Sequence, residues 1–164
     1  MANDVTLRGV QDSDLPIFFD QQLDPEATCM AAFPARPRDA FMAHWKKILA
    51  GASPMPKTIV FQGNVAGNIV CWEQHDERNV GYWLGKEYWG KGVASAALSQ
   101  FLEEVKVRPL SARVAKHNAA SIRVLQKCGF KISGEDRFPG VKGEEGEEFI
   151  LTLRASGGEK DNEI

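Results

Sequence analysis

The sequence has few of the residues that cross-link small secreted domains or bind metal ions. It contains three cysteines and three histidines among 164 residues. Cys29, Cys71 and Cys128 are odd in number and far apart, which predicts reduced thiols rather than a disulfide framework or a zinc site. The histidines are equally scattered, so we expect no bound metal.

Long apolar runs and a strong charge of one sign are also missing. No apolar run approaches the roughly 20 residues that a membrane-spanning helix needs, and the N-terminus lacks the apolar core of a signal peptide. The formal net charge is −2, whereas a nucleic-acid-binding protein normally carries a basic excess. We therefore expect a cytoplasmic protein that binds neither a membrane nor a nucleic acid.

What is present predicts one globular domain. Hydrophobic residues make up 43% of the chain and charged residues 26%, which is ordinary for a domain that buries a single core. We expect this domain to cover residues 1–154. Residues 155–164 have the glycine-rich and charged composition of a disordered tail.

The hydrophobic pattern predicts strands and helices that follow one another along the chain. Apolar residues at strand spacing lie at 5–10, 57–61, 65–73, 80–84, 109–114, 130–138 and 147–153. Apolar residues at helical spacing follow Asp12-Ser13-Asp14 and recur at 38–49, 94–105 and 118–128. This order predicts an α/β or α+β domain with helices on the faces of a sheet.

The connections between these elements are predicted from glycine, proline and polar residues. Residues 24–37 hold three prolines and show no clear period, so we expect a loop. Gly63-Asn64 predicts a tight hairpin turn, and the polar residues 75–78 a second turn. The stretch 139–148, rich in glycine and glutamate, predicts a long link between the last two strands.

The most informative stretch is residues 80–106, VGYWLGKEYWGKGVASAALSQFLEEVK. It predicts a buried strand, a glycine-rich turn and an amphipathic helix. Small residues at Gly90, Gly92 and Ala94 let successive N–H groups face one concavity at the helix start, where an anion is favoured. Lys91 adds a positive charge. A plain tight turn is the alternative, since short glycine motifs occur without a ligand.

A second stretch, residues 117–130, reads HNAASIRVLQKCGF. Together the two stretches resemble the GNAT superfamily of acetyl-CoA-dependent N-acetyltransferases. The turn resembles the family's pyrophosphate loop, Arg/Gln-x-x-Gly-x-Gly/Ala, with Trp89 where the family usually has Arg or Gln. The pattern Asn-x-x-Ser-x-x-x-Leu-x-Lys-x-Gly-Phe, which begins at Asn118, resembles the RimJ/RimL branch, whose members acetylate protein N-termini.

The resemblance implies a fold, a co-substrate and a class of acceptor. The GNAT fold is a mixed twisted sheet with helices on both faces, splayed between two central strands, here residues 80–84 and 109–114. The pantetheine arm of acetyl-CoA inserts at that split. The acceptor would be a small-molecule amine or a protein N-terminus, and a homodimer stays open as the assembly.

The resemblance also implies which residues contact acetyl-CoA. The residues so implied are Trp83, Leu84, Gly85, Trp89, Gly90, Lys91, Gly92, Val93, Ala94, Ser95, Asn118 and Ser121. For Asn118 the alternative is a helix cap, and both roles are compatible. For Ser121 the alternative is a solvated helix serine. Arg123 and Lys127 are either surface charges or partners of a cofactor phosphate.

Acetyl transfer also needs groups that stabilise charge and move protons. The resemblance places carbonyl polarisation on a backbone N–H at the end of the strand 80–84, and we expect this to be the N–H of Leu84, with Trp83 and Gly85 nearby. Many members protonate the thiolate with a tyrosine where this chain has Leu125, so Ser121 or a bound water would have to serve. Glu73, at a strand end, is the candidate base, with Glu77 and His75 in the following turn as further candidates and a solvated charge as the alternative. An N-terminal amine, whose pKa lies near 8, needs little help.

Charge predicts the acceptor. We expect residues 24–37 and 138–147 to flank the acceptor side of the cofactor, and the second segment carries Glu144, Glu145 and Glu147. Acidic walls favour a cationic amine or a protein N-terminus, although Arg36 in the first segment and Arg38 directly after it act against this. The competing function is a non-catalytic acyl-CoA-binding or regulatory domain, because no acid or base is firmly assigned.

Overall fold

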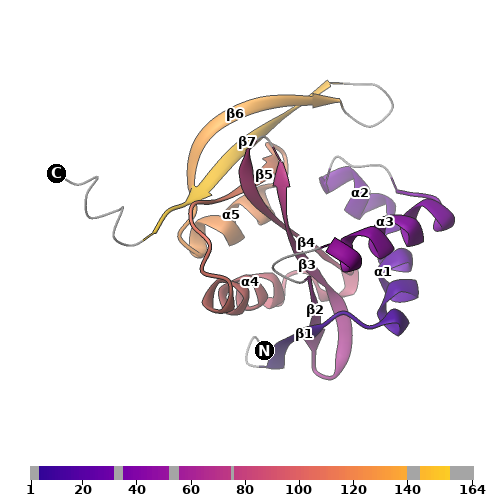
Figure 1. Ribbon diagram of the computed structural model, residues 1–164. Helices are drawn as coiled ribbons and strands as arrows, with labels where there is room; N and C mark the ends of the chain where they lie inside the picture. Colours follow the sequence, from indigo (N-terminus) through magenta and orange to yellow (C-terminus); the bar gives the residue numbers. More distant parts are fainter. Residues whose placement is uncertain (1–3, 32–34, 52–55, 75, 140–144, 156–164) are drawn as a thin grey trace.

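The computed structural model describes residues 4–31, 35–51, 56–74, 76–139 and 145–155 (Figure 1). Its described strands form one seven-stranded sheet in the order β1-β2-β3-β4-β5-β7-β6. The strands are β1 (Val5–Gly9), β2 (Lys57–Phe61), β3 (Asn64–Gln74), β4 (Glu77–Leu84), β5 (Leu110–Ala115), β6 (Lys131–Pro139) and β7 (Glu145–Leu153). β4 and β5 are parallel and the other neighbours antiparallel, which confirms the predicted mixed sheet.

Helices cover both faces of the sheet (Figure 1). On one side lie α1 (Leu15–Gln22), α2 (Pro25–Ala31) and α3 (Arg38–Gly51), and on the other lie α4 (Val93–Glu104) and α5 (Ala119–Lys127). The short 3-10 helices η2 (Asp12–Asp14) and η3 (Lys86–Tyr88) precede α1 and α4. This two-sided arrangement agrees with the expectation from the sequence.

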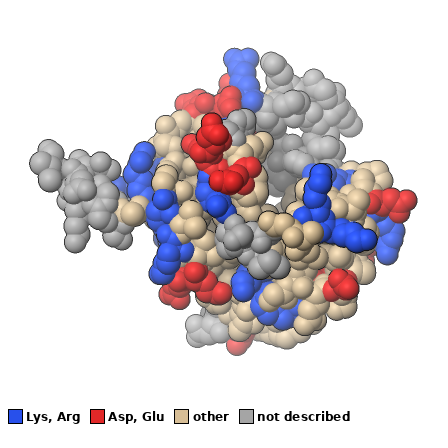
Figure 2. All heavy atoms as spheres, in the orientation of Figure 1, with Lys and Arg blue, Asp and Glu red and all other residues tan. Residues whose placement is uncertain are grey.

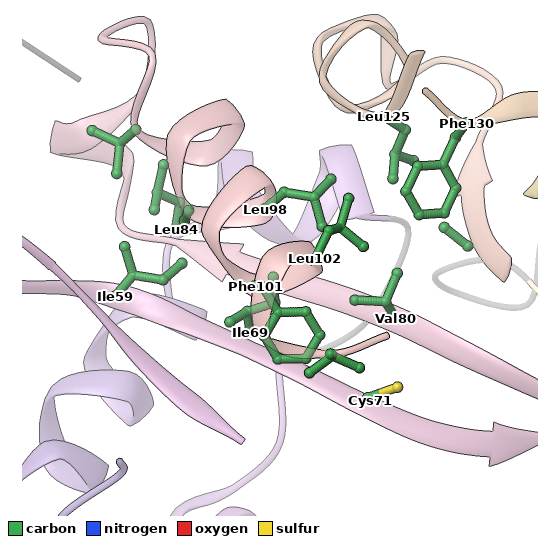
Figure 3. Packing of buried hydrophobic residues seen from close by; sticks show 14 of the residues in the cluster. Ile59, Ile69, Cys71, Val80, Leu84, Leu98, Phe101, Leu102, Leu125 and Phe130 are labelled. Atoms are coloured by element: carbon green, nitrogen blue, oxygen red, sulfur yellow. The ribbon is translucent and has the colours of Figure 1, made fainter. Parts of the chain in front are cut away.

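The larger part of the core lies between α4 and the sheet. Phe101 of α4 is fully buried, as are Ile59 of β2 and Ile69 of β3 (Figure 3). Leu98 and Leu102 flank Phe101 at helical spacing, so one face of α4 is apolar from end to end. Each such side chain contributes about 1.5–3 kcal/mol on burial. The packing therefore fixes where the first turn of α4 lies against the sheet.

The opposite face carries a smaller cluster of aromatic side chains. Phe18 of α1 lies 5.1 Å from Trp45 of α3, measured between ring centroids. Val65 and Val70 of β3 pack against this cluster from the sheet. α1 and α3 are thus attached to β3.

The sheet splays open between β4 and β5. β4 pairs with β3 along all eight of its residues. With β5 it shares only the pair Asn79↔Ser111, near the beginning of β4. The two strands diverge beyond that pair, between the segments that the family resemblance predicted. The residues from Val80 to Leu84 therefore face a gap along their β5 edge.

One predicted loop contains a helix. Residues 24–37 were predicted to be irregular, but α2 occupies seven of them. Asp24 caps this helix, because its Oδ1 accepts hydrogen bonds from the N–H groups of Glu26 (2.8 Å) and Ala27 (3.3 Å). Pro25 takes the first helical position, where its missing N–H has no cost. Two turns of helix are too short to show a hydrophobic period.

Two predicted turns also lie elsewhere. The β2–β3 turn is Gln62-Gly63, not Gly63-Asn64, with φ of 52° and 80°. This is the type I′ geometry that suits the twist of a hairpin. Glu77 and Arg78 were predicted in a turn but belong to β4, where they pair with Gln74 and Glu73.

The final hairpin is longer than predicted, and its link is correspondingly shorter. β6 extends to Pro139 and β7 begins at Glu145, so most of the acidic end of the predicted link is strand. Glu144 lies outside the described residues, as do His75 and most of the predicted tail.

Asp14 is a buried carboxylate that joins η2 to the first two strands. It is 1% exposed and accepts hydrogen bonds from the Arg8 guanidinium (2.8 and 2.9 Å), the Thr58 hydroxyl (2.7 Å) and the Gln11 N–H (2.9 Å). Burial alone would raise the pKa of Asp14. The hydrogen bonds from Arg8, Gln11 and Thr58 outweigh burial, and the pKa is lowered.

We expect Asp14→Asn to lower the free energy of unfolding by about 2 kcal/mol at pH 7, because it breaks a buried charge pair whose Arg8 partner is partly solvated. Since the folded pKa is lowered, the stabilisation is complete above the ordinary value near 4 and is lost as the pH falls through the folded value. Denaturant unfolding should therefore show that the free energies of unfolding of wild type and Asp14→Asn become equal in acid. Asp12→Asn, at an exposed position of the same turn, is the control. If the difference in unfolding free energy between wild type and Asp14→Asn did not change with pH, this account would be contradicted.

Candidate functional site

A cavity of about 470 Å³ lies at the splay between β4 and β5. Its walls come from the end of β4, the loop that follows, the first turn of α4, and α5. Ten residues predicted to contact the cofactor line this cavity: Trp83, Leu84, Trp89, Gly90, Gly92, Val93, Ala94, Ser95, Asn118 and Ser121. Gly85 and Lys91 adjoin these residues in the chain but do not line it.

The end of β4 directs one backbone N–H into the gap. The N–H of Gly85 donates to Ala66 O of β3 (2.9 Å). Successive N–H groups of an extended strand point to opposite edges, so the N–H of Leu84 points toward β5. β4 lies very close to β3 at this point: a Cβ on Gly67 of β3 would be only 2.0 Å from the Trp83 carbonyl oxygen. The Leu84 N–H is therefore a fixed donor at the cavity.

The loop after β4 ends in a helix start that no side chain caps. Gly90 and Gly92 both have positive φ, of 73° and 78°, which an L side chain rarely adopts. The first N–H that the helical pattern satisfies belongs to Ala96, which donates to Gly92 O (3.2 Å). The preceding N–H groups and the helix dipole favour an anion. Trp89, where the family usually has Arg or Gln, donates from Nε1 to Leu84 O (3.0 Å) and thus ties the loop to β4.

The charged side chains around the cavity are cationic. Arg123 and Lys127 lie one helical turn apart on α5, and both line the cavity with exposed side chains. Among the described residues, no aspartate or glutamate lines it. Lys91 is exposed on the neighbouring loop. The electrostatic potential there should attract a polyanion.

Asn118 is the N-cap of α5. Its Oδ1 accepts a hydrogen bond from the N–H of Ser121 (3.2 Å), so the capping role considered for this residue is present. Asn118 also lines the cavity. Its amide nitrogen remains a donor that the cap does not use.

Sequence reasoning missed Tyr82. Its hydroxyl donates a hydrogen bond to Ser121 Oγ (3.0 Å), and both residues line the cavity. Burial raises the pKa of Tyr82 more than the hydrogen bond to Ser121 lowers it. Period-two alternation from Val80 would have placed Tyr82 on the same face as Leu84. Only the structure brings it next to Ser121, 39 positions along the chain.

Neither Glu73, the candidate base, nor Leu125, which stands where many family members have a tyrosine, lines the cavity. Leu125 is 2% exposed and lies beside Phe130 in the core (Figure 3). Glu73 does not line the cavity; its carboxylate lies 3.9 Å from Arg78, and its side chain is 77% exposed. The structure thus places the Glu73 carboxylate at the surface and the Leu125 side chain in the core.

α2 connects the two sides of the splay. Ala27 lines the cavity. The Glu26 carboxylate lies 2.6 Å from Lys86, just after β4, and His117 Nε2 lies 2.8 Å from Cys29 O, just before α5. The predicted loop at residues 24–37 thus forms part of the wall through α2.

The other sequence predictions concern metals, membranes and the acidic hairpin. In the described ranges, no group of three or more His, Cys, Asp or Glu residues could hold a metal ion. No described helix is long and apolar enough to cross a bilayer. Over the β6–β7 hairpin, acidic and basic side chains lie interspersed (Figure 2), and Arg113 pairs there with Asp136 (2.9 Å) and Glu148 (2.8 Å).

Known proteins resemble this chain both in sequence and in structure. The chain is 25% identical over 108 residues to the protein named Putative ribosomal N-acetyltransferase YdaF of Bacillus subtilis, a match that covers 61% of this chain and 58% of that relative. A spermidine N-acetyltransferase from Vibrio cholerae, solved with CoA and spermine, superposes with a TM-score of 0.79 at 17% identity, covering 94% of this chain and 97% of that one. Ribosomal-protein-alanine N-acetyltransferase from Brucella melitensis gives a TM-score of 0.77 at 16% identity, covering 92% and 99%.

At these identities the solved structures show the fold, and they confirm the predicted mixed sheet with helices on both faces. The family follows from the sequence itself. The model of the acetyltransferase (GNAT) domain matches residues 4–131, which include the splayed strands and the cavity's loop and helices. With most of its length matched in this way, the chain belongs to the GNAT acetyltransferase family.

Proposed function

We propose that this protein transfers the acetyl group of acetyl-CoA to a primary amine. One observation carries the proposal: the gap between β4 and β5 holds a cavity that begins at an uncapped helix N-terminus and is lined by cations but by no described carboxylate. The N–H groups at that helix start would hold the pyrophosphate, with Arg123 and Lys127 beside it. The pantetheine arm would follow the gap along β4.

The transfer step needs charge stabilisation where the carbonyl oxygen becomes negative. We assign this to the N–H of Leu84, whose direction the Gly85–Ala66 hydrogen bond fixes. A donor held in this way needs no reorganisation as the charge develops. The sulfur leaves with the electron pair of the C–S bond, and Ser121 is the hydroxyl that would donate to it.

The amine must lose a proton, and Glu73 is poorly placed for this because it pairs with Arg78 at the surface. We propose that the acceptor enters as the neutral amine and releases one of its two N–H protons to water as the C–N bond forms. A protein N-terminus, with a pKa near 8, is roughly one-tenth neutral at pH 7. This favours a protein N-terminus or another primary amine that needs no strong base.

The proposed class of acceptor rests on the relatives rather than on the charge of the hairpin. One relative is named a ribosomal N-acetyltransferase, and a structural neighbour was solved with spermine. We therefore propose a protein N-terminus in the manner of the RimJ/RimL branch, with a small cationic amine as the second class. Glu147, an exposed carboxylate of β7, pairs with Lys116 at 3.4 Å, so the acidic hairpin is partly neutralised.

The test is a mass-resolved acetylation assay. The protein is incubated with acetyl-CoA and a panel that contains a short peptide with a free N-terminus, the same peptide blocked at its N-terminus, and polyamines. We expect acetylation of the free peptide and release of one free thiol per acetyl group. A competing function, a non-catalytic acyl-CoA-binding domain, is favoured by the position of Glu73 outside the cavity and by the leucine at position 125. Tight CoA binding without thiol release for any amine would support that alternative and overturn ours.

Asn118 offers a sharper test of the cavity. Asn118→Ser keeps a good helix cap but removes the amide nitrogen. If that nitrogen holds the pantetheine arm, CoA affinity should fall about tenfold, as for one lost hydrogen bond. Titration calorimetry measures the affinity, and thermal unfolding without ligand is the control, which should hardly change. Unchanged affinity would leave Asn118 as a cap alone.

A further inference from the structure

The cavity contains a hydrogen-bonded pair of hydroxyl groups, of which the family resemblance predicted Ser121 but not Tyr82. Tyr82 comes from β4 and Ser121 from α5, so their 3.0 Å hydrogen bond joins the strand on one side of the splay to the helix that lines the cavity. Position 125 of α5 is a leucine and its side chain is buried in the core, so this position brings no hydroxyl to the cavity. Tyr82 brings a phenol to the cavity from another element.

We propose that Tyr82 is a positioning residue, whose hydroxyl holds Ser121 so that the serine's only proton points into the cavity, toward the sulfur of the leaving thiol. This inference rests on the proposed function. A serine hydroxyl has one proton and two acceptor lone pairs. If a neighbour donates to it, the serine proton is free for another acceptor.

The direction of the hydrogen bond follows from acidity. A phenol, with a pKa near 10, is a stronger donor than an aliphatic hydroxyl, so Tyr82 donates and Ser121 accepts. Burial keeps the pKa of Tyr82 raised, and the phenol therefore stays protonated at neutral pH. Helix serines often donate instead to a carbonyl of the preceding turn. Among the described residues, Ser121 makes no such bond.

All proton transfers in this reaction balance while Tyr82 stays protonated. The amine nitrogen forms a bond to the acetyl carbon, and the C–S bond breaks with both electrons going to sulfur. Sulfur takes the Ser121 proton. Ser121 then regains a proton from water, which received one from the amine nitrogen. Tyr82 orients Ser121 throughout and does not itself contact the reacting atoms.

The test is Tyr82→Phe, which removes the hydroxyl and keeps the ring. We expect kcat to fall about tenfold, as for one hydrogen bond, with the acetyl-CoA KM within about twofold of wild type. Ser121→Ala should lower kcat at least as much. The double variant should be no slower than Ser121→Ala alone, because Tyr82 acts through Ser121. With an acetyl thioester of a more acidic thiol, which leaves more easily unprotonated, the Tyr82→Phe defect should shrink.

The contradicting outcomes are distinct. If Tyr82→Phe turns over like wild type, or if it slows Ser121→Ala by the same factor as it slows wild type, Tyr82 does not act through Ser121 and this inference is wrong. If wild type acetylates no amine, the proposed function fails and this inference falls with it.

Discussion

Gly92→Glu should weaken binding of acetyl-CoA by at least about 100-fold, equivalent to about 2.7 kcal/mol. The backbone at Gly92 has a φ of 78°, which glutamate adopts only with strain. The new carboxylate would also lie at the start of α4, where the proposed phosphate binds. Thermal unfolding measures the effect, because a ligand that binds only the folded state raises Tm by mass action. We expect the Tm rise of wild type with CoA to disappear.

The matched control is Gly63→Glu in the β2–β3 turn. Gly63 has nearly the same φ, 80°, and lies outside the cavity lining. The Gly63→Glu variant should be less stable because of this strain, but CoA should still raise its Tm. If CoA raised the Tm of Gly92→Glu as much as that of Gly63→Glu, phosphate would not bind at this loop.

Reversing both cations of α5, Arg123→Glu with Lys127→Glu, should also weaken acetyl-CoA binding by about 100-fold at low salt. Each charge-assisted contact with phosphate is worth about 1.5–3 kcal/mol, and reversal adds repulsion. Both side chains are exposed, so the effect should shrink as salt rises. Titrations at several salt concentrations measure the affinity and its salt dependence.

Lys46→Glu with Lys47→Glu gives the same change of net charge on α3. These lysines are exposed and do not line the cavity. Their reversal should leave the affinity within about twofold of wild type. Equal losses in the two double variants would mean that overall charge, and not the α5 pair, governs binding.

The parts of the site that sequence predicted are those with local signals. The strand, turn and helix from Val80 to Glu104 follow from apolar spacing and from Gly90 and Gly92. The Asn118 cap is equally local, since its partner Ser121 lies three positions away. The splay between β4 and β5 was predicted from the family resemblance. Residue propensities do not predict it, because it depends on how far the two strands remain paired.

The parts that sequence missed depend on long-range contacts or on short elements. Tyr82 and Ser121 meet only when β4 and α5 take their places. Glu73 looked suitable because it lies near the end of a strand, but its pairing register puts it beside Arg78, away from the cavity. α2 was missed because its seven residues are too few to show a hydrophobic period, although Asp24 followed by Pro25 is a typical helix start.

The central claim is that the gap between β4 and β5 binds acetyl-CoA for transfer to an amine. A crystal structure of the protein with CoA tests it most directly. We predict the pyrophosphate on the N–H groups that begin α4, the pantetheine along β4, and the thiol within hydrogen-bonding distance of Ser121 Oγ. CoA bound outside this cavity, or with its thiol away from both Leu84 and Ser121, would contradict the account.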